Sequence, residues 1–136
     1  MNNTAVHANA SNRASVYDGN PFRPIRRFEI WLADLPLNPE THVQGGLRPV
    51  LIMSCCLDAN SPVVSVIPLT SKRKRLWMDS HVLFRGAGMR QPSLALIEQV
   101  TTIDKRILVR KIGALTEPMS QNAINEALIH HMGLGA

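Results

Sequence analysis

The sequence predicts a mainly β (α+β) fold, a small curled antiparallel sheet or barrel followed by a C-terminal helix. Short apolar segments follow one another closely and are separated by Gly, Pro and Asn, which is typical of a small antiparallel sheet. Only the last segment repeats its apolar residues at steps of three and four, as an amphipathic helix does. At 136 residues the chain has room for one domain with a real core.

The predicted strands differ in pattern along the chain. In residues 28–34, the apolar residues Phe28, Ile30 and Leu32 alternate with Glu29 and Trp31, whereas the later strands are short and continuously apolar. These later strands are residues 50–56, 63–69, 81–84, 93–98 and 107–112.

The elements are bounded by recognisable signals. A turn at residues 58–62 makes a hairpin of the two neighbouring strands. The helix is expected to begin near Pro118, with Thr116 or Glu117 as its cap, and to stop at Gly133.

The predicted domain occupies residues 25–136. Residues 1–24 are rich in Asn, Ala and Ser, lack periodicity and end among prolines, which predicts a flexible N-terminal arm.

Several function classes are excluded by the composition. No apolar run approaches the ~18 residues needed to cross a bilayer, so no membrane association is expected. Cys55 and Cys56 are adjacent and too few for a disulfide scaffold, which indicates a reducing, cytoplasmic compartment. The histidines form no helical i, i+4 pair and no cofactor motif is present, so neither a metal nor a cofactor is expected.

The charge of the chain favours a polyanionic partner. The net charge is +5 and the pI is about 9.9, with arginine, the better fork for phosphate, outnumbering lysine. Such a basic domain suits a nucleic acid or an acidic protein, although a merely solvated basic surface remains an alternative. Aromatic residues make up only 4%, which argues against a base-stacking platform.

One pair of residues stands out as a candidate site. An antiparallel hairpin centred near residue 59 sets Arg48 opposite Thr70, beside Gly45 and Gly46 and the basic residues 72–75. An arginine, a hydroxyl and exposed loop amides at one place can bind a phosphodiester and stabilise its transition state. The alternatives are a surface arginine, a turn-capping threonine and a solvated basic loop, and a slipped register would separate the pair.

The order and spacing of several stretches resemble the MazF/PemK toxins of bacterial toxin–antitoxin systems. The matching stretches are RFEIWLADL (27–35), QGGLRPVLI (44–52), SPVVSVIPLTSK (61–72), SHVL (80–83), PSLALIEQVTTID (92–104) and KIGAL (111–115), together with the closing helix.

This resemblance implies an SH3-like barrel that works as a homodimer and cleaves single-stranded RNA at specific sequences without a metal. It implies that Arg48 and Thr70 carry the cleavage. The residues expected near RNA, including the basic loop, are Gln44, Gly45, Gly46, Ser71, Lys72, Arg73, Arg75, Glu98 and Gln99.

A metal-independent cut requires the RNA 2′-hydroxyl to attack the neighbouring phosphorus and expel the 5′-oxygen. Arg48 is too basic to accept a proton, so Glu29, Glu98 and His81 are the candidate acid–base groups. One position departs from the family pattern, because Phe28-Glu29 stands where these toxins usually have Gly-Asp, and a flexible backbone position is lost.

Two other functions remain open for the same fold. One is a toxin that poisons DNA gyrase, and the other is an inactive regulator that binds nucleic acid. For a toxin, the expected protein partner is an antitoxin whose acidic tail covers the basic groove.

Overall fold

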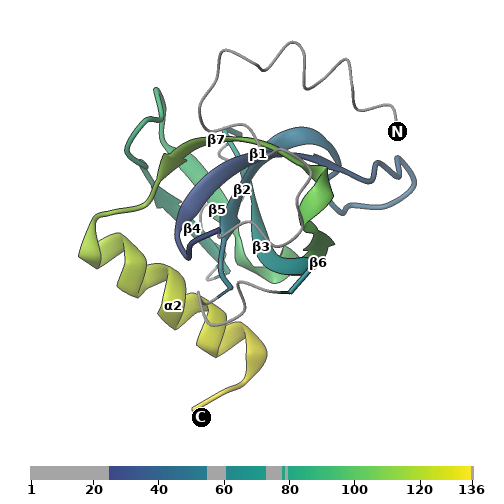
Figure 1. Cartoon of the computed structure of the whole chain (residues 1–136). Helices are drawn as coiled ribbons and strands as arrows, with labels where there is room; N and C mark the ends of the chain where they lie inside the picture. The colour runs from purple at the N-terminus through teal and green to yellow at the C-terminus, as the bar shows by residue number, and fades with distance from the viewer. Residues whose placement is uncertain (1–24, 55–60, 73–77, 79, 136) are drawn as a thin grey trace.

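An antiparallel sheet curls around an apolar interior, and one helix packs on its outside (Figure 1). The computed structural model describes residues 25–54, 61–72, 78 and 80–135. The elements, in chain order, are β1 (Glu29–Leu35), β2 (Gly46–Ile52), β3 (Val63–Thr70), β4 (His81–Phe84), β5 (Ser93–Leu96), the 3₁₀ turn η2 (Ile97–Gln99), β6 (Thr101–Asp104), the 3₁₀ turn η3 (Lys105–Ile107), β7 (Leu108–Ala114) and α2 (Pro118–Met132).

The strands follow the order β4-β5-β3-β2-β1-β7, and β6 pairs with β3 off this path. In the described part of the chain, β4 and β7 are not joined as neighbouring strands, so the sheet is curled but not closed. A single bridge between Ala87 and Ala114 links the β4–β5 connection to β7. The mainly β fold with a C-terminal helix is therefore confirmed.

Strand β3 changes partners along its length, and this change places its last residue at the candidate site. Its first half pairs with β6, and its end pairs with β5, where Thr70 lies opposite Leu94. On its other side, β3 pairs with β2 in a register that sets Val50 opposite Pro68. This is the predicted hairpin register. When it is extended by two residues along each strand, Arg48 lies opposite Thr70.

Both faces of the central strands are buried. One apolar cluster contains Trp31 and Val50, while the other contains Ile30, Leu51 and, from the helix, Ile124. Because successive strand residues point to opposite faces, burial of both faces requires continuous apolar runs. This explains why the later strands lack the alternation seen in a half-exposed strand.

Helix α2 has the predicted limits. The Glu117 carboxylate accepts a hydrogen bond from the Ser120 backbone N–H at 3.0 Å, and Gly133 ends the helix at φ 72°. A hydrogen bond from the Ser120 hydroxyl, together with this backbone bond, stabilises the charged form and lowers the pKa of Glu117. The apolar stripe is narrower than expected, because Met119 and Met132 are 77% and 55% exposed.

Several predicted strand limits were wrong. Strand β2 begins at Gly46, inside the predicted loop, and ends at Ile52. The predicted strand 93–98 ends at Leu96, where a 3₁₀ turn begins, and the last strand runs over Leu108–Ala114. Strand β6 was missed entirely.

Three sequence predictions fall on parts of the chain that the structure does not describe. The N-terminal arm, Cys55-Cys56 and most of the basic loop lie outside the described residues. Among the helices that are described, none is long and apolar enough to span a membrane.

Candidate active site

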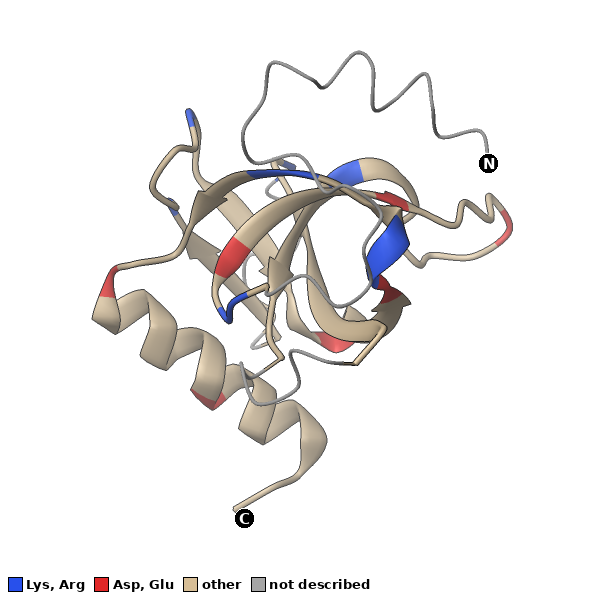
Figure 2. Ribbon diagram, in the orientation of Figure 1, with Lys and Arg blue, Asp and Glu red and all other residues tan. Residues whose placement is uncertain are grey.

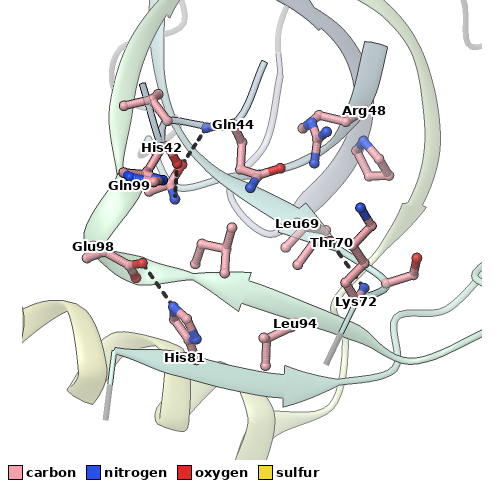
Figure 3. A pocket seen from close by; sticks show the side chains of 14 residues that line it. His42, Gln44, Arg48, Leu69, Thr70, Lys72, His81, Leu94, Glu98 and Gln99 are labelled. Atoms are coloured by element: carbon pink, nitrogen blue, oxygen red, sulfur yellow. Dashed lines mark hydrogen bonds and ion pairs between the residues drawn. The ribbon is translucent and has the colours of Figure 1, made fainter. Parts of the chain in front are cut away.

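A pocket of about 690 Å³ opens where the ends of β2 and β3 meet β4, β5 and η2 (Figure 3). Its lining combines cationic, amide, hydroxyl and apolar groups. The lining residues are His42, Val43, Gln44, Arg48, Pro49, Leu69, Thr70, Ser71, Lys72, His81, Leu94, Leu96, Glu98 and Gln99.

The predicted pair lines this pocket together. Arg48 comes from β2 and Thr70 from the end of β3, and Figure 3 shows both on the same side of the pocket. Arg48 donates from Nε to the Gly45 carbonyl oxygen at 2.9 Å, and among the described residues this is the one hydrogen bond of its guanidinium. The terminal amino groups of the guanidinium then remain for an anion, which they can grip with two parallel hydrogen bonds.

The Thr70 side chain is oriented by its own loop. Its Oγ1 accepts a hydrogen bond from the Lys72 backbone N–H at 3.2 Å. A hydroxyl that accepts in this way still has its hydrogen to donate. Thr70 can therefore donate to a phosphate oxygen that Arg48 also holds.

The two glycines before Arg48 have different structural roles. At Gly45, a Cβ atom would lie 2.4 Å from the Pro36 carbonyl oxygen, so no side chain fits there. Gly46 has φ 82°, a conformation that other residues rarely adopt. The glycine pair thus lets the loop pass close to the end of β1 and turn into β2.

Gln99 holds the far edge of this loop. Its Oε1 accepts a hydrogen bond from the Gln44 backbone N–H at 2.7 Å, and its Nε2 donates to the His42 carbonyl oxygen at 3.4 Å. The Gln99 side chain therefore sets the position of the Gln44 side chain in the pocket wall.

His81 and Glu98 form a pair across the pocket from Arg48 and Thr70 (Figure 3). His81 Nε2 lies 2.9 Å from Glu98 Oε2, and the two side chains are 6% and 29% exposed. The other carboxylate oxygen, Oε1, is buried and makes no hydrogen bond with the described residues. The pair joins a proton carrier to a carboxylate inside the pocket, a combination used for acid–base catalysis.

Glu29 lies outside the pocket, in contrast to the other acid–base candidates. It forms an ion pair with Lys111 at 3.2 Å and accepts a hydrogen bond from Trp31 Nε1 at 3.0 Å. These contacts give it a structural role at the start of β1. Of the predicted basic loop, Lys72 lines the pocket, whereas Arg73 and Arg75 lie outside the described residues.

Sequence reasoning missed some of the lining. His42 and Val43 lie in a loop without a motif, and their place depends on the bonds from Gln99. Leu94 and Leu96 were predicted as strand residues only, although their side chains form the pocket floor beside Thr70. Among the described residues, no three His, Cys, Asp or Glu side chains gather into a potential metal site.

The curled sheet carries an arginine and a hydroxyl at adjoining strand ends, groups that can hold an anion, and comparison with known proteins specifies the class. The family model of the PemK-like, MazF-like toxins of type II toxin–antitoxin systems matches residues 26–132. The chain belongs to this family.

Individual relatives agree with this assignment. The chain is 32% identical to endoribonuclease EndoA of Bacillus subtilis over 107 residues, which cover 76% of this chain and 90% of EndoA. The solved structure of Mycobacterium tuberculosis toxin MazF-mt6 has a TM-score of 0.65 and 25% identity, with 79% of this chain and 99% of that chain covered.

A further solved structure supports the fold alone. It is a mycobacterial endoribonuclease in complex with its cognate antitoxin, with a TM-score of 0.64 and 22% identity. The match covers 83% of this chain and 97% of that chain.

Proposed function

We propose that this toxin is a sequence-specific endoribonuclease that cleaves single-stranded RNA without a metal. The observation that carries the proposal is the placement of Arg48 and Thr70 in one pocket, at the ends of two paired strands. Its relative in B. subtilis is named an endoribonuclease, which supports the same activity here.

The reaction is an internal transfer at one phosphodiester. The RNA 2′-oxygen forms a bond to phosphorus, the bond from phosphorus to the 5′-oxygen breaks, and a 2′,3′-cyclic phosphate remains. The proton of the 2′-hydroxyl leaves during attack, and the 5′-oxygen gains a proton as it departs. The protein must hold these atoms in line and stabilise the added negative charge.

Arg48 and Thr70 stabilise the phosphate. The guanidinium binds the non-bridging oxygens, where charge accumulates in the transition state, and the Thr70 hydroxyl donates to the same group or orients the 2′-oxygen. Lys72, at the mouth of the same pocket, adds positive charge that attracts the RNA backbone.

Proton transfer is assigned to the pocket wall that lies opposite Arg48 and Thr70. Of the His and Glu side chains that line the described pocket, His81 and Glu98 contact one another, and we assign proton transfer to this pair. One member of the pair accepts the 2′-hydroxyl proton, and the other keeps the acceptor oriented. The amide groups of Gln44 and Gln99 supply hydrogen bonds for bases on either side of the cut.

Membership of the family supports a proposal for the biological setting. The toxin acts as a homodimer in the cytoplasm, and an antitoxin with an acidic tail blocks it. Carboxylates of that tail occupy the place of RNA phosphates beside Arg48 and Lys72, so the two ligands compete.

Cleavage in the presence of EDTA tests this function directly. Purified protein incubated with a long RNA is expected to give discrete fragments with 2′,3′-cyclic phosphate ends, and mapping of the ends gives the recognised sequence. Loss of all cleavage in EDTA, with recovery on adding Mg²⁺, would contradict the metal-independent mechanism. Trapping of gyrase on cleaved DNA, or RNA binding without product, would establish one of the other two functions.

A further inference from the structure

A second pocket, of about 520 Å³, lies on the other side of Thr70. It shares four lining residues with the first pocket, Pro49, Leu69, Thr70 and Ser71. Its remaining lining comes from the β4–β5 connection, the first residue of β5 and strand β7, namely Gly88, Met89, Arg90, Gln91, Pro92, Ser93, Arg110 and Ile112. The two pockets therefore meet along the strand end that carries the proposed catalytic threonine.

Two arginines on separate segments line this second pocket. Arg90 belongs to the β4–β5 connection and Arg110 to β7. The connection is fixed to β7, because Ala87 and Ala114 exchange backbone hydrogen bonds of 2.7 and 3.0 Å. Figure 2 shows basic positions both on β7 and at the tip of this connection.

Close packing keeps the two segments together. Gly88 has φ 90°, and a Cβ atom there would lie 2.7 Å from the Ile112 carbonyl oxygen. The connection thus rests directly on the backbone of β7, with no side chain between them. A contact of this kind holds the backbones that carry Arg90 and Arg110 at a fixed separation.

The charged side chains that line the second pocket, among the described residues, are all positive. No Asp or Glu side chain is among its described lining residues, whereas Glu98 lines the first pocket. The ion pairs in the described part of the chain join His81 to Glu98 and Lys111 to Glu29, so they use neither arginine. Two guanidinium groups without a carboxylate partner in a concave site attract an anion.

We propose that the second pocket is a subsite for the nucleotide next to the scissile linkage, with Arg90 and Arg110 holding its phosphate. The inference rests on the proposed RNA cleavage. RNA is the favoured occupant because the pocket continues the first one across Thr70, so one strand can cross both. Met89, Ile112 and Pro92 offer apolar surface for the sugar or base beside that phosphate.

A binding experiment with matched variants tests the subsite. The probe is an RNA containing the mapped cleavage sequence, with a single 2′-deoxy nucleotide that prevents cleavage. Arg90→Gln with Arg110→Gln is expected to weaken binding roughly tenfold, as loss of charge-assisted hydrogen bonds does. The slope of log K against log salt should also fall by about 0.7 for the phosphate contact that is lost.

Arg106→Gln is the matched control, because Arg106 is exposed and lines neither pocket. It removes one positive charge, as Arg90→Gln or Arg110→Gln does alone, and it should leave the affinity within about twofold of the wild type, since distant surface charges are screened by salt. If Arg106→Gln and the double variant weaken RNA binding equally, the effect comes from net charge alone and the proposed subsite is wrong.

Neutral methylphosphonate linkages locate the contact. Methylphosphonate in place of the flanking phosphate should weaken RNA binding to the wild type. It should not weaken RNA binding to the double variant any further. If methylphosphonate at every linkage weakens binding to the wild type and to the double variant alike, the proposal is wrong. It is also wrong if the double variant keeps the RNA affinity of the wild type and instead dimerises more weakly or binds an acidic peptide more weakly. Wild-type protein that binds a long all-ribose RNA through the two arginines but never cuts it would refute the nuclease function and leave the subsite standing.

Discussion

The two pockets that meet at Thr70 differ in chemistry. The first contains the His81–Glu98 pair and a loop held by Gln99, whereas the second presents arginines without an acidic residue in its described lining. In the proposed function, the groups that move protons therefore lie in the first pocket, and the second pocket holds phosphate without contributing to proton transfer. Substitutions in the first pocket should therefore lower kcat, and substitutions in the second should mainly weaken binding.

The largest effect is expected from Arg48→Ala. It removes the guanidinium aimed at the transition-state charge, which should lower the cleavage rate on the order of 10²–10³-fold. Arg48→Lys keeps the charge but loses the planar fork, so its rate should lie between those of the wild type and the alanine variant. A fluorogenic RNA–DNA chimera reports the rates, and thermal unfolding confirms that each variant is folded. Full activity of Arg48→Ala would contradict the assigned site.

A smaller effect is expected from the opposite wall. Glu98→Gln and His81→Gln each remove a group proposed for proton transfer while keeping a polar side chain, and kcat should fall about 100-fold with little change in KM. The pH profile of kcat should lose one limb in the variant that lacks the proton acceptor.

Glu29→Gln provides the contrast for these two variants. Because Glu29 lies outside the pocket and pairs with Lys111, its substitution should lower stability and leave kcat close to that of the wild type. Should Glu29→Gln lower kcat as strongly as Glu98→Gln, the division between the structural and catalytic carboxylates would be wrong.

Local sequence signals were enough for part of the site. The hairpin register that brings Arg48 to Thr70 follows from two apolar runs and one turn, because side-chain alternation and turn position fix antiparallel pairing. The end of the helix at Gly133 is equally local, since a glycine accommodates the left-handed conformation there.

Other features depend on contacts between distant segments. Strand β6 has the sequence Thr-Thr-Ile-Asp with one buried residue, and pairing with β3 rather than an apolar pattern makes it a strand. The bond from Gln99 to the Gln44 backbone spans 55 residues of sequence. Arg90 and Arg110 line one pocket because the β4–β5 connection rests on β7. No local pattern encodes these contacts.

The smallest effect is expected from substitution of Phe28. Because Phe28 lies outside both pockets, its substitution should change the stability of the protein rather than its activity. Phe28 has φ 69°, a left-handed conformation, and its backbone is held by hydrogen bonds to Ile52 and Leu115 of 2.7 and 2.8 Å. For a residue with a Cβ atom this conformation costs about 1–2 kcal/mol. The cost is offset by packing of the ring on the second apolar cluster and by the Arg27 guanidinium, 4.9 Å from the ring centre.

Two substitutions separate this strain from the packing. Phe28→Ala loses the ring and keeps the Cβ atom, whereas Phe28→Gly loses the ring and relieves the strain. Phe28→Gly should therefore unfold with a free energy about 1 kcal/mol higher than Phe28→Ala in urea denaturation, against the usual penalty for glycine. The reverse order would show that residue 28 does not need a left-handed backbone. The phenylalanine at this position would then carry no conformational cost.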